Sequence, residues 1–231
     1  MTLPPYTAML LFPLLLSTAQ FLSDKINIER SMFRQHLASF GAAIAITYLL
    51  LVFLPETYRS GFTVSAYFPL LLGFVAIHLL EKFIYKKFSG RYSLHKLKTY
   101  HDELHAAIIF GYHFLIGAAL VNVTGNNLQA GLLFLPPLLM FTTIGNWSVH
   151  HHYVTQNNVL RLVLASSTMV GAISAIAFSL SPLVNSILLN FVAGVMLFVV
   201  VRESLPKEKE GKPLLFILGV IAYTTLILIF Q

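Results

Sequence analysis

Eight mainly apolar stretches, each about 20 residues long, constrain the fold of this chain more than any other feature. Inside a membrane only helices and closed barrels satisfy the backbone, and a helix needs about 20 apolar residues to cross. Charged residues make up 10 % of the chain, whereas soluble domains contain about 25 %. The sequence therefore predicts an all-α polytopic membrane protein, with residues 1–231 forming a single transmembrane domain. The expected helices cover 5–23, 37–55, 62–81, 104–123, 127–149, 160–179, 182–201 and 213–230, and a basic cytoplasmic loop covers 82–103.

The basic residues predict how these helices are oriented. Fourteen of the 15 Lys and Arg residues lie in, or at the edge of, the connections between the first and second, third and fourth, fifth and sixth, or seventh and eighth helices. Arg59 alone lies in a connection on the opposite side. Because cytoplasmic loops carry an excess of Lys and Arg, we expect a multi-pass protein of the plasma membrane with both termini outside. This topology explains the net charge of +6, and we expect the lipid bilayer, and no nucleic acid, as a partner.

The histidines gather toward the predicted cytoplasmic face. His101 and His105 are four residues apart, so on a helix they share a face and can hold one metal ion together. Alternatively they belong to an interfacial helix start, where the acidic Asp102 and Glu103 are favoured. His113 lies deeper in the same apolar stretch, and an ionisable residue at membrane depth suggests a function. The chain has no cysteine, which excludes a thiolate metal site.

A short pattern recurs in the two halves of the chain. The second predicted helix ends in Phe53-Leu-Pro-Glu56, and the third contains a Pro-Leu-Leu run that leads to Gly73. The seventh ends in Ser204-Leu-Pro-Lys207, and the eighth opens with a Pro-Leu-Leu run that leads to Gly219. The first pair of helices is joined outside and the second inside, as an inverted repeat requires. Transporters use such repeats to alternate access to a central site.

Four parts of the sequence resemble the ZIP family of divalent metal transporters. They are similar to the family's second, third, sixth to seventh and last helices, and they are Leu49–Thr57, Leu71–Lys82, Ser181–Val184 with Asn190–Pro206, and Pro213–Phe230. The resemblance implies eight helices in a 3+2+3 inverted-repeat bundle with both termini outside. It also implies a homodimer and a divalent metal ion, zinc first, as the ion that is bound or carried.

The chain departs from the family where the family's metal ligands are expected. Aligning the fourth helix on Gly117 puts Tyr112 where the family has His and Ile116 where it has Asp. In the fifth helix the family carries carboxylates, whereas Phe141–His152 contains none. Glu203 in the seventh helix matches a polar position of the family. The candidate metal ligands are His101, His105, His113, His150, His151, His152 and Glu203.

The resemblance makes transport of a divalent metal ion by alternating access the first function that we expect, without enzymatic activity. Two alternatives remain open. Histidine clusters at the cytoplasmic face also occur in membrane oxidoreductases with a di-metal centre, which the pair His101/His105 and the run His150–His152 fit loosely. The missing carboxylates favour a scaffold or partner subunit that keeps the transporter fold without an ion path.

Overall fold

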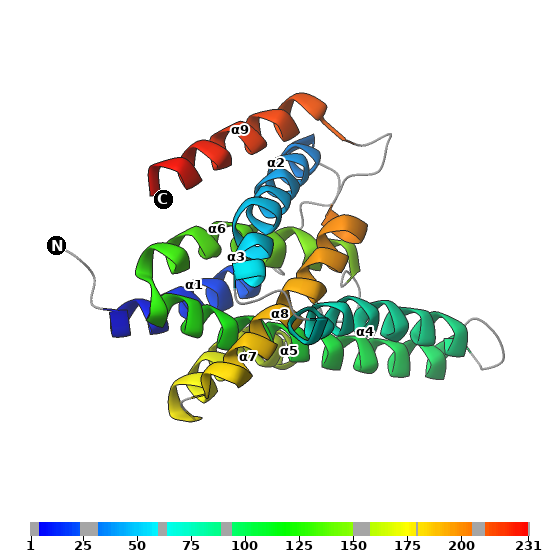
Figure 1. The fold of residues 1–231 in the computed structure, drawn as a ribbon. Coiled ribbons are helices and arrows are strands. Elements are labelled where there is room, and N and C mark those ends of the chain that lie inside the picture. The colour runs from blue at the N-terminus through cyan, green and yellow to red at the C-terminus, as the bar shows by residue number, and fades with distance from the viewer. Residues whose placement is uncertain are drawn as a thin grey trace.

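The computed structural model describes residues 5–23, 32–59, 64–88, 94–149, 158–178, 180–204 and 211–230. Every regular element in these ranges is a helix (Figure 1). Within the described residues, six helices are long and apolar enough to cross a membrane, and two others contain shorter apolar segments at Tyr67–Leu80 and Leu128–Thr143. The chain is therefore an all-α, multi-pass membrane protein, as predicted.

The helix bounds agree with the prediction at both ends of the chain and differ in its middle. The predicted loop over 82–103 is mostly helical, because α4 continues to Phe88 and α5 begins at Leu94. Neither extension contains Gly or Pro, and Lys and Leu are good helix formers, so both helices run on past their apolar segments. In chain order the elements are α1 (Pro5–Ser23), α2 (Met32–Tyr48), η1 (Leu49–Phe53), α3 (Leu54–Arg59), α4 (Val64–Phe88), α5 (Leu94–Asn126), α6 (Leu128–Val149), α7 (Asn158–Phe178), α8 (Pro182–Val199), η3 (Val200–Ser204) and α9 (Pro213–Phe230).

Two helices widen for one π-helical turn near their ends, where η1 continues α2 and η3 continues α8. In the sequence each π turn stands directly before a Leu-Pro pair, at Leu54-Pro55 and Leu205-Pro206. A proline has no backbone N–H, and in a regular helix its ring collides with the carbonyl four residues earlier. That carbonyl belongs to Leu51 in η1 and to Arg202 in η3. In η1 the wider turn accommodates Pro55. In η3 a turn of the same kind precedes the same Leu-Pro pattern in the sequence, whose Leu205 and Pro206 lie outside the described residues.

Glycines bring two pairs of helices into backbone contact. At the α4–α8 crossing, a Cβ on Gly73 or on Gly194 would overlap a backbone carbonyl of the other helix. The α5–α7 crossing is built in the same way at Gly117 and Gly171. Small residues at crossings allow the close approach that drives helix association in membranes. A side chain at any of these four positions would force the helices apart.

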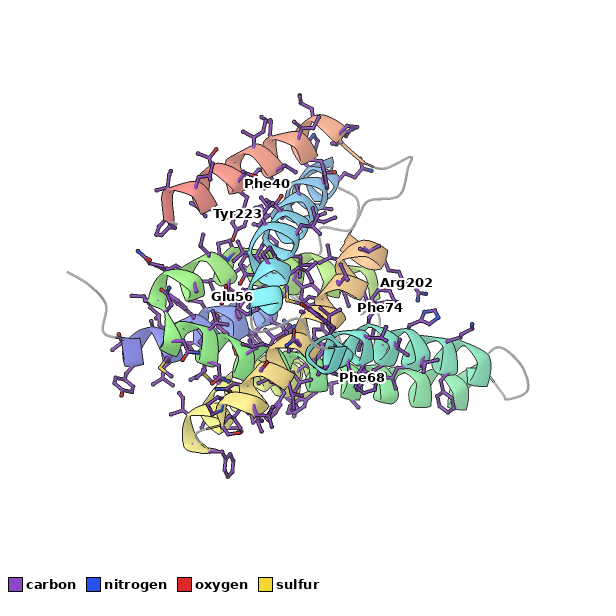
Figure 2. The ribbon with its side chains drawn as sticks, in the orientation of Figure 1. Phe40, Glu56, Phe68, Phe74, Arg202 and Tyr223 are labelled. Atoms are coloured by element: carbon purple, nitrogen blue, oxygen red, sulfur yellow. The ribbon has the colours of Figure 1, made fainter. Side chains whose placement is uncertain are left out.

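A corresponding contact joins α9 to α2. A Cβ on Gly219 of α9 would lie 2.9 Å from the carbonyl oxygen of Phe40 in α2. Figure 2 shows Phe40 where the two helices meet. On the other side of the bundle, the carbonyl that a Gly73 Cβ would overlap belongs to Phe191 of α8. Phe40 precedes η1 by nine residues, and Phe191 precedes η3 by nine residues. The contacts of α9 with α2 and of α4 with α8 therefore use corresponding positions of two helices with the same π turn.

The centre of the bundle is filled by apolar side chains. The rings of Tyr48, Phe53 and Phe134 stack on one another with centroids 5.2 to 5.7 Å apart. They belong to one cluster of buried residues contributed by α1, α2, η1, α5, α6, α8, η3 and α9. Aromatic pairs in this arrangement contribute about 0.5–1.5 kcal/mol each beyond their burial. Other members of the cluster are Leu16, Leu49, Ile116, Leu120, Leu138, Phe141, Val192 and Met196.

One polar contact crosses this apolar region. Tyr223 of α9 points toward the bundle (Figure 2), and its hydroxyl donates a hydrogen bond to the carbonyl of Leu133 in α6. In a regular helix that carbonyl would accept from the residue four positions later, which here is Pro137 and has no N–H. Tyr223 therefore satisfies a buried acceptor that the proline leaves without a helical partner.

Candidate functional site

Among the predicted metal ligands, His113 is the one whose side chain the structure describes. Its ring is fully buried in α5. Nδ1 lies 3.1 Å from the carbonyl oxygen of Ile109 and 3.4 Å from Nε2 of Gln20 on α1. Depending on the tautomer, Nδ1 donates to the Ile109 carbonyl or accepts from the Gln20 amide. The His113 ring thus lies at the contact between α5 and α1.

The other predicted ligands are placed by their backbones alone or lie outside the described residues. His101 and His105 lie on consecutive turns of α5, although the helix was predicted to begin at residue 104, so His101 lies in the segment that was predicted as a loop. Glu203 lies in the π turn η3. His150–His152 lie outside the described residues. In the ranges that the structure describes, no three His, Asp or Glu residues group in a way that could hold a metal ion. A joint metal site of these residues stays a prediction.

Where the ZIP resemblance expects ligands on α5, the structure has apolar packing. Ile116 is 1 % exposed and belongs to the central cluster. Tyr112 meets Phe141 of α6 edge to face, with ring centroids 5.6 Å apart. The neighbouring Thr142 is buried, and its hydroxyl donates to the Leu139 carbonyl of its own helix at 3.1 Å. These side chains fill the space between α5 and α6 with carbon.

Buried polar side chains lie instead on α1, α5 and α7, three helices that pack on one another. Ser17 and Gln20 are three residues apart on α1, and both are buried. Gln20 contacts His113 of α5. Thr168 of α7 is fully buried, and its carbonyl lies at the α5–α7 crossing against Gly117, one helical turn from His113. We refer to Ser17, Gln20, His113 and Thr168 as the α1–α5–α7 polar interface.

Arg161, in the first turn of α7, holds the end of α1 beside this interface. Its side chain is 4 % exposed. Nη2 donates to the Phe21 carbonyl at 3.0 Å, and Nη1 donates to Oδ1 of Asn158 at 3.3 Å. The guanidinium carbon lies 5.0 Å from the centroid of the Phe21 ring. The last carbonyls of a helix lack helical partners and carry partial negative charge, so Arg161 both caps α1 and complements its dipole.

Sequence patterns alone did not single out Ser17, Gln20 or Thr168, and Arg161 was used only to orient the helices. One signal was present in the sequence. Ser17 and Gln20 are spaced so that they share a face of an otherwise apolar helix, as His101 and His105 do on theirs. What the spacing cannot tell is which helix that face meets.

A comparison of the chain with protein-family models finds no match, and a comparison with curated proteins finds none either. The fold and the arrangement of polar side chains therefore define a class. The chain is a helical, multi-pass membrane protein with a large buried apolar cluster and buried polar side chains on α1, α5 and α7.

Proposed function

We propose that this chain is an eight-span membrane protein with the ZIP-like 3+2+3 arrangement. Six spans come from the long apolar helices, and α4 and α6 supply the other two through their shorter apolar segments. In this proposal α1, α2 and α4 form the first unit, α5 and α6 the central pair, and α7, α8 and α9 the second unit. The observation that supports the repeat best is the pair of π turns, which stand before Leu54-Pro55 and Leu205-Pro206.

The helix contacts also support two related units. Gly219 meets Phe40 where α9 packs on α2, and Gly73 meets Phe191 where α4 packs on α8. If α8 corresponds to α2 and α9 corresponds to α4 in the two units, then the contact of α9 with α2 corresponds to the contact of α4 with α8. The alternating placement of the basic connections favours opposite orientations of the two units, as an inverted repeat requires.

Within this fold, the geometry supports best a scaffold or partner subunit that has no central ion path. The observation that carries this proposal is the apolar filling of the centre, with Ile116, Leu138 and Phe141 all buried there. A dication that leaves water needs several oxygen or imidazole ligands, and aliphatic and aromatic side chains supply none. Moving an unpaired charge into such surroundings costs tens of kcal/mol by Born solvation. A fold shared with transporters does not by itself supply transport, because function depends on the site.

Transport of a divalent metal ion is the second candidate, and the repeated units favour it because alternating access operates between such units. The ligands would then come from the predicted cytoplasmic end. His101 and His105 on one face of α5 and Glu203 in η3 are the first we would assign, with His113 deeper in the same helix. His150–His152 complete the predicted set.

Metal influx into proteoliposomes with a trapped zinc-sensitive dye tests both proposals. Wild type is compared with the double variant His105→Ala/Glu203→Ala and with His78→Ala, which removes an exposed histidine of α4 outside the ligand set. We expect no zinc, cadmium, iron or manganese flux above protein-free vesicles, from protein shown to be folded by gel filtration. Flux in wild type and in His78→Ala that disappears in the double variant would overturn the scaffold proposal. Flux that persists in the double variant would overturn the ligand assignment as well.

A further inference from the structure

Most hydroxyl side chains on these helices bond to their own backbone. The hydroxyls of Ser23, Ser167 and Thr143 donate to a carbonyl three or four residues earlier at 2.6 to 2.8 Å. This local bond is how Ser and Thr usually satisfy themselves in an apolar helix. Ser17 and Thr168 differ, because within the described residues neither hydroxyl oxygen has a hydrogen-bond partner, although both side chains are buried.

The same interface contains a third atom of this kind. Gln20 is 1 % exposed, and its Oε1 lacks a partner in the part of the chain that the structure describes. Ser17 lies about one turn from Gln20 on α1, and Gln20 contacts His113. The Thr168 carbonyl lies against Gly117, which is about one turn along α5 from His113. Thr124 also has an unpartnered hydroxyl, but it lies near the end of α5 and against Gly131 of α6, so it is separate from this interface. Buried polar atoms in native proteins almost always have a partner, so three in one interface point to an occupant.

The chemistry of the three atoms selects the occupant. A carbonyl oxygen such as Oε1 can only accept a hydrogen bond, whereas the two hydroxyls can both donate and accept. An occupant must therefore offer a hydrogen to Oε1, and it pairs with the hydroxyl hydrogens of Ser17 and Thr168 only if it also offers lone pairs. To a metal ion these four side chains offer uncharged oxygen atoms and the imidazole of His113, whose Nδ1 already lies against the Ile109 carbonyl and the Gln20 amide, and no carboxylate. Arg161, on the same helix as Thr168, adds a positive charge beside the interface and further disfavours a cation.

We propose that the α1–α5–α7 polar interface is a binding site for water, held by Ser17, Gln20 and Thr168 beside His113. A buried water typically makes about three hydrogen bonds to groups of this kind and is costly to remove. The bound water joins α1 to α7 in addition to the direct bond that Arg161 makes to the Phe21 carbonyl. The polar site of this membrane protein thus lies between these helices rather than in the bundle centre. The proposal does not depend on whether the protein transports an ion.

The substitution Thr168→Val tests the proposal through the sign of its effect on thermal stability. Valine has nearly the shape of threonine but replaces the hydroxyl by a methyl group. If water is bound, the variant loses a hydrogen bond and leaves the water one partner short, so the midpoint of thermal unfolding falls by about 2–4 °C. If the interface is dry, the hydroxyl is an unsatisfied group in wild type, and valine leaves the midpoint unchanged or raises it. The second result would overturn the proposal.

Two further variants make the test specific. Thr225→Val is the matched control, because the Thr225 hydroxyl is exposed and donates to the Ile221 carbonyl of its own helix at 2.8 Å. It should leave the midpoint nearly unchanged. Ser17→Ala removes the second hydroxyl, and if both hydroxyls bind the same water the double variant loses less than the sum of the single losses. If the fall in the midpoint for the double variant equals the sum of the two single falls, the two hydroxyls act independently, and a water shared by both is overturned. If a variant does not fold, a wild-type map at about 2 Å resolution decides by the presence or absence of a water peak between α1 and α7.

Discussion

The packing of α4 against α8 makes Gly194→Ala a severe change for the addition of a single methyl group. A Cβ at Gly194 would overlap the Leu70 carbonyl and would lie 2.9 Å from the backbone nitrogen of Phe74. Both obstacles are backbone atoms, which cannot rotate away as a flexible side chain would. The helices must therefore move apart, and overpacking of this kind costs about 1–3 kcal/mol, with the upper value expected here. In a protein of this length about 3 kcal/mol corresponds to a fall of about 6–12 °C in the midpoint of thermal unfolding.

Gly111→Ala is the matched control for this prediction. Gly111 also lies within a helix, α5, but a Cβ there meets no heavy atom within 4 Å. Alanine is the better helix former by about 1 kcal/mol, so this variant should unfold about 2–4 °C above wild type. Both variants are measured in the same detergent by intrinsic fluorescence on heating. Equal midpoints for Gly194→Ala and Gly111→Ala would refute the backbone contact between α4 and α8.

Two other substitutions test single polar contacts by the same measurement. Tyr223→Phe leaves the buried Leu133 carbonyl without a donor and should lower the free energy of unfolding by about 1–3 kcal/mol. Tyr6→Phe is the control, because the Tyr6 side chain is 79 % exposed, and it should leave the free energy of unfolding unchanged. Equal midpoints for the two variants would contradict the role of Tyr223. Arg161→Met keeps much of the apolar contact but removes the donor to the Phe21 carbonyl, and we expect a similar loss. An unchanged midpoint for Arg161→Met would show that the end of α1 is stable without its cap.

Helix starts were predicted best where a proline fixes them. α1, α8 and α9 begin at Pro5, Pro182 and Pro213, as the sequence predicted, because proline suits the first turn of a helix, where its missing N–H is not needed. At α8 the preceding Ser181 adds a cap, accepting a hydrogen bond from the Val184 N–H at 3.4 Å. The ends of α4 and α5 were predicted poorly because hydropathy falls at the membrane surface, whereas backbone hydrogen bonding continues into the Lys-rich segments.

The site was predictable in what it lacks more than in what it contains. The departures at Tyr112 and Ile116 indicated a centre poor in metal ligands, and the structure fills that region with apolar side chains. The contact between Gln20 and His113 was not predictable, because it joins residues 93 positions apart on helices whose meeting faces are set by tertiary packing. Spacing within one helix identifies residues that share a face. Only the fold determines that the faces of α1, α5 and α7 meet.

The apolar centre bears on the choice between the two proposed functions because of what a transport cycle would require of it. Alternating access moves one repeat unit against the other around a site between them. In the proposed arrangement, α2 and η1 belong to the first unit and α6 to the central pair, and the stacked rings of Tyr48, Phe53 and Phe134 join them. A motion that opened the centre would break these contacts, at about 0.5–1.5 kcal/mol for each ring pair in addition to the loss of close packing. Among the residues that the structure describes, it would expose no group of three metal ligands in return. For a partner subunit the same contacts are favourable throughout, because they keep the centre closed while the outer helices bind. The stacked rings therefore favour the scaffold proposal on energetic grounds as well as on ligand chemistry.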